Sequence, residues 1–282
     1  MKSKEELLKA INEMPKFEYR EIALKVPTTP AIGPPVDRND SQVIEAQPAT
    51  YQDVPACWTA ITEVGKSNPI CFASSKYKLM QFKEAFEPLV SAHEDVEGKL
   101  VMHQGFAVLD LFPKDQNMTV ATPAGDVYKI GMSAYNSVDR TSALMIRFSV
   151  TDNDRIITFP KNVATYYQAH VGQVKEKTDA YQKLMTQIKE FWPQIVNDMS
   201  STEVTKDLFG TITKDFKTDP QIVKALQAEV EAGAKYNLWS MMMEIYDRMG
   251  RKYSKSDVHL RKRQDDFIQS VMDWAKMIAV FM

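Results

Sequence analysis

The densest run of side chains that could do chemistry lies late in the chain, between Arg248 and Arg263. It holds seven cations and a single anion, Asp257, which gives a local charge of +6. Guanidinium and ammonium groups at this density can contact nucleic-acid phosphates, and an aromatic ring among them, Tyr253, can stack on a base. Two alternatives stay open: a solvated turn between helices whose cations pair with acids elsewhere in the chain, or a patch that holds subunits together.

The composition of the whole chain sets the limits. Its 282 residues include 35 Lys and Arg against 37 Asp and Glu, a net charge of -2, so the residues outside the basic run carry -8. This balance argues against a histone-like DNA coat but leaves a local basic surface open. A hydrophobic content of 44% excludes a chain that is disordered throughout.

The sequence carries no local catalytic motif. It has no phosphate-cradling glycine loop, no GxSxG and no HExxH, and its four histidines are isolated. Cys57 and Cys71 cannot make a disulfide framework and offer no zinc-binding spacing. We therefore expect no enzymatic activity, no cofactor and no metal ion, although an active site built from residues scattered along the chain stays open.

The elements that must position the basic run predict an α+β fold. Three β-rich segments, residues 99–112, 118–134 and 143–159, are separated by turn residues and predict an antiparallel meander of about five strands. The apolar period then changes, which predicts one long helix over residues 164–199 across the sheet. We divide the chain into an N-terminal helix, strand and proline-rich arm (1–50), an α+β core (51–200) and a helical C-terminal subdomain (201–282).

Shorter elements flank this core. Ser3 and Glu6 have the spacing of a capping box at the start of a helix over residues 3–14. We further expect a strand over 17–26 and helices over 75–92, 201–208, 219–236, 238–249 and 262–281.

Two segments predict assembly. Seven prolines between Pro15 and Pro55 make residues 27–50 an extended arm or linker, which either wraps a neighbouring subunit or lies across its own domain. The apolar residues 274–282 must dock on the core of their own chain or on a neighbour. We expect a homo-oligomer. Because no run of 18 apolar residues and no signal peptide occurs, we expect a soluble cytoplasmic protein without a membrane partner.

A polar stretch, Tyr135–Leu144, enters a predicted strand as Asn-Ser-Val-Asp-Arg-Thr-Ser-Ala-Leu after its tyrosine. With the strand Gly105–Leu109 before it, Ala169–Gly172 at the start of the predicted long helix, and Leu238-Trp239 further on, it resembles phage and plasmid-like proteins that carry the domain of unknown function numbered 932. The resemblance covers about residues 70–260. It implies an origin in a virus or mobile element and no defined activity.

Two departures limit what the resemblance implies. Arg140 replaces a glycine of the family motif, and Phe159–Val163 stands where the family often has Cys-x-Asn-Gly, so no role of that cysteine is implied here. The order of elements is also similar to the single-strand annealing proteins of the Rad52 and phage recombinase type, which bind single-stranded DNA in a cationic groove. The predicted sheet region, residues 99–160, has six cations and six anions, which weakens this similarity.

The function that we expect is non-enzymatic binding of single-stranded DNA in recombination or replication, by an oligomer in the cytoplasm of a bacterial or archaeal host. The rival is a protein-binding or self-assembling module, such as a viral assembly component or an inhibitor of a host defence protein. The residues expected to contact nucleic acid are Arg140, Arg147, Arg155, Lys161, Arg248, Arg251, Lys252, Lys255, Arg261, Lys262 and Arg263 on the phosphates and Tyr135 or Tyr253 on the bases; those of the family-motif loop are Asn136, Ser137, Asp139 and His170.

Overall fold

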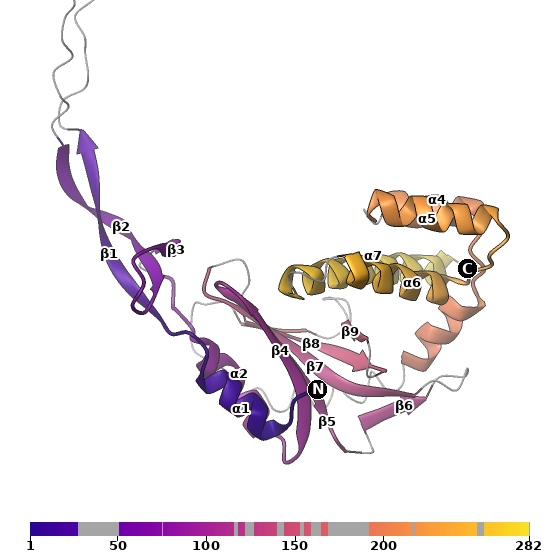
Figure 1. The fold of residues 1–282 in the computed structure, drawn as a ribbon, viewed down its shortest axis with the longest axis horizontal. Helices are drawn as coiled ribbons and strands as arrows, with labels where there is room; N and C mark the ends of the chain where they lie inside the picture. Colours follow the sequence, from indigo (N-terminus) through magenta and orange to yellow (C-terminus); the bar gives the residue numbers. More distant parts are fainter. Residues whose placement is uncertain are drawn as a thin grey trace, which may run out of the picture.

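The computed structural model describes residues 1–27, 51–74, 76–115, 118–121, 127–139, 144–152, 155–158, 165–168, 192–215, 218–252 and 257–281. For residues 22–27, 51–58, 165–168, 215, 252, 257–259 and 273–281 it describes the backbone alone. A slender N-terminal arm projects from a curled sheet, two helices lie at the foot of that arm, and the C-terminal helices gather over the other end of the sheet (Figure 1). The predicted α+β class is confirmed.

Helix α1 (Lys4–Asn12) begins where the sequence predicts it. The Ser3 hydroxyl accepts a hydrogen bond from the backbone N–H of Glu6, and the Glu6 carboxylate accepts one from the backbone N–H of Ser3. This capping box satisfies two donors that have no partner within the helix. Helix α2 (Phe82–Ser91) packs against α1, and buried residues of both helices, among them Leu7 and Phe86, form one apolar core with the sheet.

The arm is an antiparallel sheet in the order β1-β2-β3, built from β1 (Phe17–Pro27), β2 (Tyr51–Glu63) and β3 (Pro69–Ser74). Strand β1 pairs with β2 from end to end, whereas β3 pairs only with residues 58–62 of β2. Phe17, Ile61 and Ala73 are buried in the same core as α1 and α2, and they anchor the base of the arm. Its outer half stands clear of the other described elements (Figure 1).

The larger sheet has seven strands with the path β10-β8-β7-β5-β4, to which β6 and β9 are added beside β7 and β8. Its strands are β4 (Val96–His103), β5 (Phe106–Pro113), β6 (Thr119–Ala121), β7 (Val127–Ser137), β8 (Leu144–Thr151), β9 (Ile156–Thr158) and β10 (Thr165–Gln168). A Cβ atom on Gly98 or Gly131 would lie 2.2 or 2.1 Å from a carbonyl oxygen of β5. Only glycine fits these two close approaches between neighbouring strands.

The C-terminal helices form a second core with the far end of this sheet. They comprise a helix over residues 192–201 and α4 (Lys206–Asp215), α5 (Pro220–Glu231), α6 (Leu238–Lys252) and α7 (Asp257–Phe281). Tyr128 of β7 meets Trp192 and Trp239 edge to face, with ring centroids 5.5 and 6.3 Å away. The helices therefore pack on the sheet through aromatic as well as aliphatic contacts.

Several predicted boundaries are wrong. The helix predicted over 164–199 does not exist as one element, because residues 165–168 form β10 and pair with β8. The Thr-Tyr-Tyr sequence favours a strand, and this pairing overrides the helical period that follows. The helix predicted from residue 75 begins only at Phe82, because residues 76–81 are not helical. The segment 99–112 is two strands, which are joined by a turn in which Gln104 has φ 50°.

The C-terminal boundaries differ as well. Residues 202–205 are not helical, so the helix predicted over 201–208 is instead α4, which begins at Lys206. Helix α6 continues through Gly250, which was expected to end it. Helix α7 begins at Asp257, five residues before the predicted start. Residues 28–50, which contain most of the proline-rich segment, lie outside the described residues. Among the helices that the structure describes, we found none with the length and apolarity that a membrane crossing requires.

Candidate functional site

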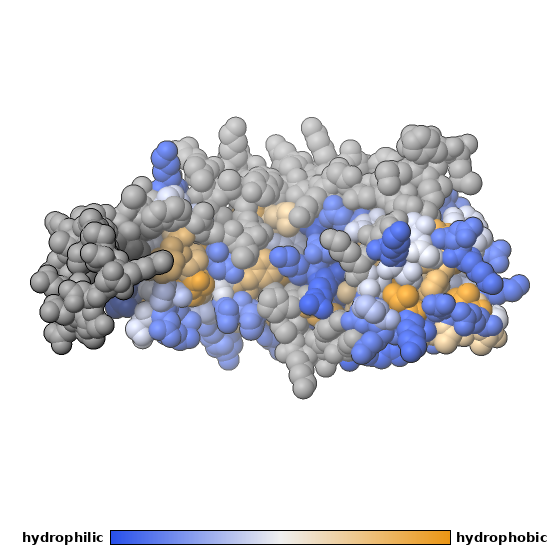
Figure 2. All heavy atoms as spheres, turned by 90° about the horizontal axis from the view of Figure 1, so that it is seen from above, coloured by the Kyte–Doolittle hydropathy of each residue, from blue (hydrophilic) through white to orange (hydrophobic). Residues whose placement is uncertain are grey.

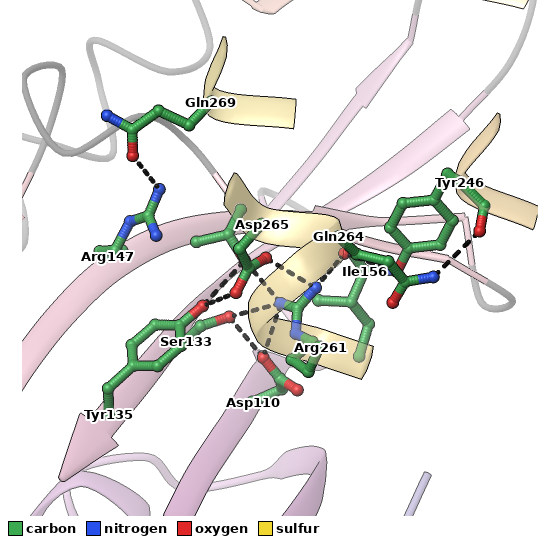
Figure 3. Close-up of polar contacts among 11 residues, drawn as sticks. Asp110, Ser133, Tyr135, Arg147, Ile156, Tyr246, Arg261, Gln264, Asp265 and Gln269 are labelled. Carbon is green, nitrogen blue, oxygen red and sulfur yellow. Dashed lines mark hydrogen bonds and ion pairs between the residues drawn. The ribbon is translucent and has the colours of Figure 1, made fainter. Parts of the chain in front are cut away.

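The basic run meets the sheet at Arg261, a residue of α7 whose side chain is almost fully buried. Its Nη2 lies 3.2 Å from a carboxylate oxygen of Asp110 on β5, and its Nη1 lies 3.1 Å from one of Asp265, a turn further along α7. The guanidinium also donates to the hydroxyls of Ser133 and Thr158. Figure 3 shows the guanidinium at the centre of these groups.

The face of the sheet beneath α7 is polar because of the strand register. Asp110, Ser133 and Arg147 are direct neighbours across β5, β7 and β8, and their side chains therefore share one face. Ser149 and Thr158 form the next row on the same face. All five residues are buried. The opposite face carries the apolar residues of the two cores, so the helix that covers the polar face must supply hydrogen-bonding partners.

Helix α7 supplies those partners. The Tyr135 hydroxyl of β7 donates to Asp265, and the Ser133 hydroxyl donates to Asp110 (Figure 3). Arg147 lies with its guanidinium carbon 5.9 Å from the centre of the Tyr135 ring, and it donates to the side chain of Gln269 over 3.4 Å. Four strands and one helix are thus joined in one buried polar cluster, which we name the α7 clamp: Asp110, Ser133, Tyr135, Arg147, Thr158, Arg261, Asp265 and Gln269.

The charges of the α7 clamp are set by burial and by proximity. Burial raises the pKa of Asp110, although the positive Arg261 and the Ser133 hydrogen bond oppose the rise. Burial alone would lower the pKa of Arg261, but Asp110 and Asp265 outweigh it and hold that pKa well above its ordinary value. Burial, with the nearby Asp265, also raises the pKa of Tyr135. At neutral pH, Arg261 is therefore a cation and Tyr135 a neutral donor.

Other predicted contact residues are held in ion pairs. Arg248 lies 2.6 Å from Glu229 and 2.7 Å from Glu244, and its side chain is 18% exposed. Arg251 lies 3.1 Å from the same Glu244, with its side chain 69% exposed. On the sheet side, Arg155 lies 2.9 Å from each of two aspartates, Asp152 and Asp247. Lys262 and Arg263 are exposed on α7.

The remaining predicted residues divide into buried and undescribed ones. Asn136 and Ser137 belong to β7 and are buried, and the Asn136 amide donates to the backbone carbonyl of Met80 over 3.2 Å. Tyr135 is buried as well, so its ring is not accessible to a base in this conformation. Asp139 is half-buried. Arg140, Lys161, His170, Tyr253 and Lys255 lie outside the described residues, and only the backbone of Lys252 is described.

Sequence reasoning did not find the partners of Arg261. One signal was present: Asp110 interrupts the apolar strand Phe-Ala-Val-Leu-Asp-Leu-Phe, and a charge inside a strand that is buried on both faces needs a partner. That partner lies 151 residues away along the chain. The i,i+4 spacing of Arg261 and Asp265 was the second signal.

Within the part of the chain that the structure describes, no group of three or more His, Cys, Asp or Glu residues is arranged to hold a metal ion. The α7 clamp is closed to water-borne substrates because its polar groups are buried against each other. Chemically it fixes α7 on the polar face of the sheet. Searches with the chain matched no family model, no curated protein and no solved structure. The resemblances stated above therefore stay predictions.

Proposed function

We propose that the protein is a non-enzymatic protein-binding module that self-assembles, with the N-terminal arm as its contact surface. The observation that carries this proposal is the outer half of the arm, where Ala23–Pro27 pair with Tyr51–Pro55 beyond the end of β3. A two-stranded ribbon without a third strand or a packed layer is marginally stable in water. A ribbon of this kind gains stability when a partner covers it.

The register of the ribbon supports a protein partner. It sets Leu24 opposite Val54 and Lys25 opposite Asp53. Since side chains alternate between faces, the Leu24 pair and the Lys25 pair belong to opposite faces of the ribbon. One face thus carries an aliphatic pair, which is the chemistry of a protein contact, and the other a pair of opposite charges.

The charge of the arm also favours protein over nucleic acid. Residues 17–74 contain four cations and seven anions, a net charge of -3. Phosphates repel such a surface, whereas a basic protein surface attracts it. The setting that we propose is the cytoplasm of a bacterial or archaeal host of a virus or mobile element.

Light scattering after size exclusion tests the proposal with two arm variants. In the first, residues 24–54 are replaced by Asn-Gly, which closes a hairpin between the paired Ala23 and Pro55. The matched control replaces residues 28–50 by Asn-Gly between the paired Pro27 and Tyr51 and so keeps the whole ribbon. We expect the full chain and the control to assemble and the first variant to be a monomer. A full chain that stays at 32.1 kDa at every concentration would overturn self-assembly.

The second candidate function is binding of single-stranded DNA in recombination or replication, which the exposure of Arg251, Lys262 and Arg263 favours. These three cations would contact phosphates, and their contribution would weaken steeply as the salt concentration rises. Fluorescence anisotropy with a labelled oligothymidylate tests it, with the three residues changed to glutamine as the comparison. Salt-sensitive binding by the full chain that the triple variant loses supports DNA binding. Equal binding by the two proteins, or none by the full chain, excludes this surface.

A further inference from the structure

The chain carries two surfaces of opposite charge that it does not bring together. We propose that copies join head to tail, with the acidic arm of one copy seated on the basic α6–α7 end of the next. This inference rests on the proposed self-assembly and adds the identity of the partner and the mode of association. The basic surface, named here the α6–α7 basic end, consists of Arg251, Lys262 and Arg263 beside the turn between α6 and α7.

Internal ion pairing separates this surface from the rest of the basic run. Arg261 is consumed by the α7 clamp, where it faces two buried carboxyl groups. Arg248 faces Glu229 and Glu244. The same oxygen of Glu244 also lies nearest to Arg251, so that two guanidinium groups share one carboxylate and an excess of positive charge is left there. Arg251 is 69% exposed despite this contact.

The α6–α7 basic end is placed to receive a second chain. Helices α6 and α7 lie side by side over the sheet, so Arg251 near the end of α6 and Lys262 near the start of α7 flank one turn (Figure 1). Hydrophilic residues cover much of the described surface seen from this side (Figure 2). A charged surface of this kind suits a charged partner better than an apolar one.

The arm presents the matching charge. Its net charge of -3 includes Glu18 and Glu21, whose side chains are exposed on β1. The arm also offers apolar contact, because Tyr19 is 47% exposed and Phe72 is 50% exposed. Acidic groups around partly exposed aromatic rings fit a surface of arginine and lysine side chains through both charge and cation–π contact.

Charge also distinguishes the head-to-tail arrangement from a symmetric one. A two-fold dimer through the arms would place two surfaces of net charge -3 against each other, and like charges facing across an interface oppose binding. An arm on an α6–α7 basic end pairs opposite charges in every contact. Because each copy then has one free arm and one free basic end, the contact repeats and builds rings or open filaments.

Mixing of two variants tests this arrangement. One variant lacks the ribbon, with residues 24–54 replaced by Asn-Gly, and the other carries Arg251→Gln, Lys262→Gln and Arg263→Gln. Each lacks one of the two surfaces, so we expect each alone to be a monomer in light scattering. A one-to-one mixture has only one complementary arm and basic end per pair. It is therefore expected to form a dimer with one copy of each variant and nothing larger, and this dimer dissociates as NaCl rises from about 50 to about 500 mM.

Two results overturn the head-to-tail arrangement and are told apart from failure of the proposed function. If the triple glutamine variant assembles like the full chain while the arm variant does not, the arm binds elsewhere, and the proposed function stands without this inference. If the mixture contains no mixed dimer although both variants are folded by circular dichroism, the two surfaces do not meet. A full chain that is monomeric at every concentration overturns the proposed function itself.

Discussion

The underside of α7 and the projecting arm both carry many charged residues, but the structure treats them in opposite ways. Under α7, charged and polar groups are buried and paired with each other, as with Arg261 between Asp110 and Asp265. On the arm, charged residues such as Glu18 and Glu21 stand on a narrow sheet exposed to solvent. The difference shows that charge density along a sequence does not reveal which charges a partner can reach.

The largest expected effect comes from breaking the α7 clamp. Arg261→Met leaves two buried carboxyl groups without their cation, which we expect to lower the free energy of unfolding by about 3 to 5 kcal/mol. Lys262→Met, the same change at the next and exposed residue, is expected to alter it by less than about 0.5 kcal/mol. Urea denaturation of both variants measures the difference. Equal stabilities would contradict a structural role for Arg261.

A smaller effect is expected from a single hydroxyl in each region. Tyr135→Phe removes the buried donor to Asp265, and we expect a loss of about 2 kcal/mol, as for a hydrogen bond to a charged group. Tyr19→Phe removes the hydroxyl that donates to the Tyr77 carbonyl on the exposed base of the arm, and a loss below about 1 kcal/mol is expected. Thermal unfolding of both variants checks the order, which a larger loss for Tyr19→Phe would reverse.

The α7 clamp also predicts a dependence of stability on pH. The folded pKa of Asp110 is raised above its ordinary value of 3.8, so the folded chain holds this proton more tightly than the unfolded chain. The contribution of Asp110 to stability is thus greatest below pH 3.8 and declines as the pH rises through the folded pKa. Compared with Asp110→Asn, the wild type should lose relative stability from about pH 4 to about pH 7 in parallel denaturation series. A difference that stays constant with pH would contradict the raised pKa.

The smallest effect is expected when the arm is shortened. Replacing residues 24–54 by Asn-Gly removes a ribbon that stands clear of the two cores, so the unfolding free energy of a monomeric chain should change by less than about 0.5 kcal/mol. Urea denaturation at low protein concentration measures it. A loss comparable to that of Arg261→Met would mean that the arm serves the fold rather than a partner.

Local chemistry explains what the sequence could predict. The capping box at Ser3, the strand from Phe17 and the start of α5, where Asp219 caps Pro220, depend on neighbours within a few residues, and all three are confirmed. The α+β class followed from the change of apolar period. The long helix over 164–199 was wrong because a strand pairing formed elsewhere in the fold decides the state of residues 165–168.

The accessibility of the predicted contact residues could not be read in the same way. Arg147, Arg155 and Arg261 are separated along the chain from the groups that hold them, Gln269, Asp247 and Asp110. A sequence pattern reports charge and spacing, whereas burial depends on which strands and helices pack together. The apolar residues 274–282, expected to dock on the core or on a neighbour, lie outside the side chains that the structure describes.

Hydrogen exchange measured by mass spectrometry at two protein concentrations tests most directly whether the arm is the contact surface. We predict that the amides of Ala23–Pro27 and Tyr51–Pro55 exchange fast in dilute protein and become protected as the concentration rises, because a second copy then covers the ribbon. The amides of β5 and β7 should be protected equally at both concentrations. Ribbon amides that exchange at one rate at both concentrations, while the full chain assembles, would contradict assembly through the arm.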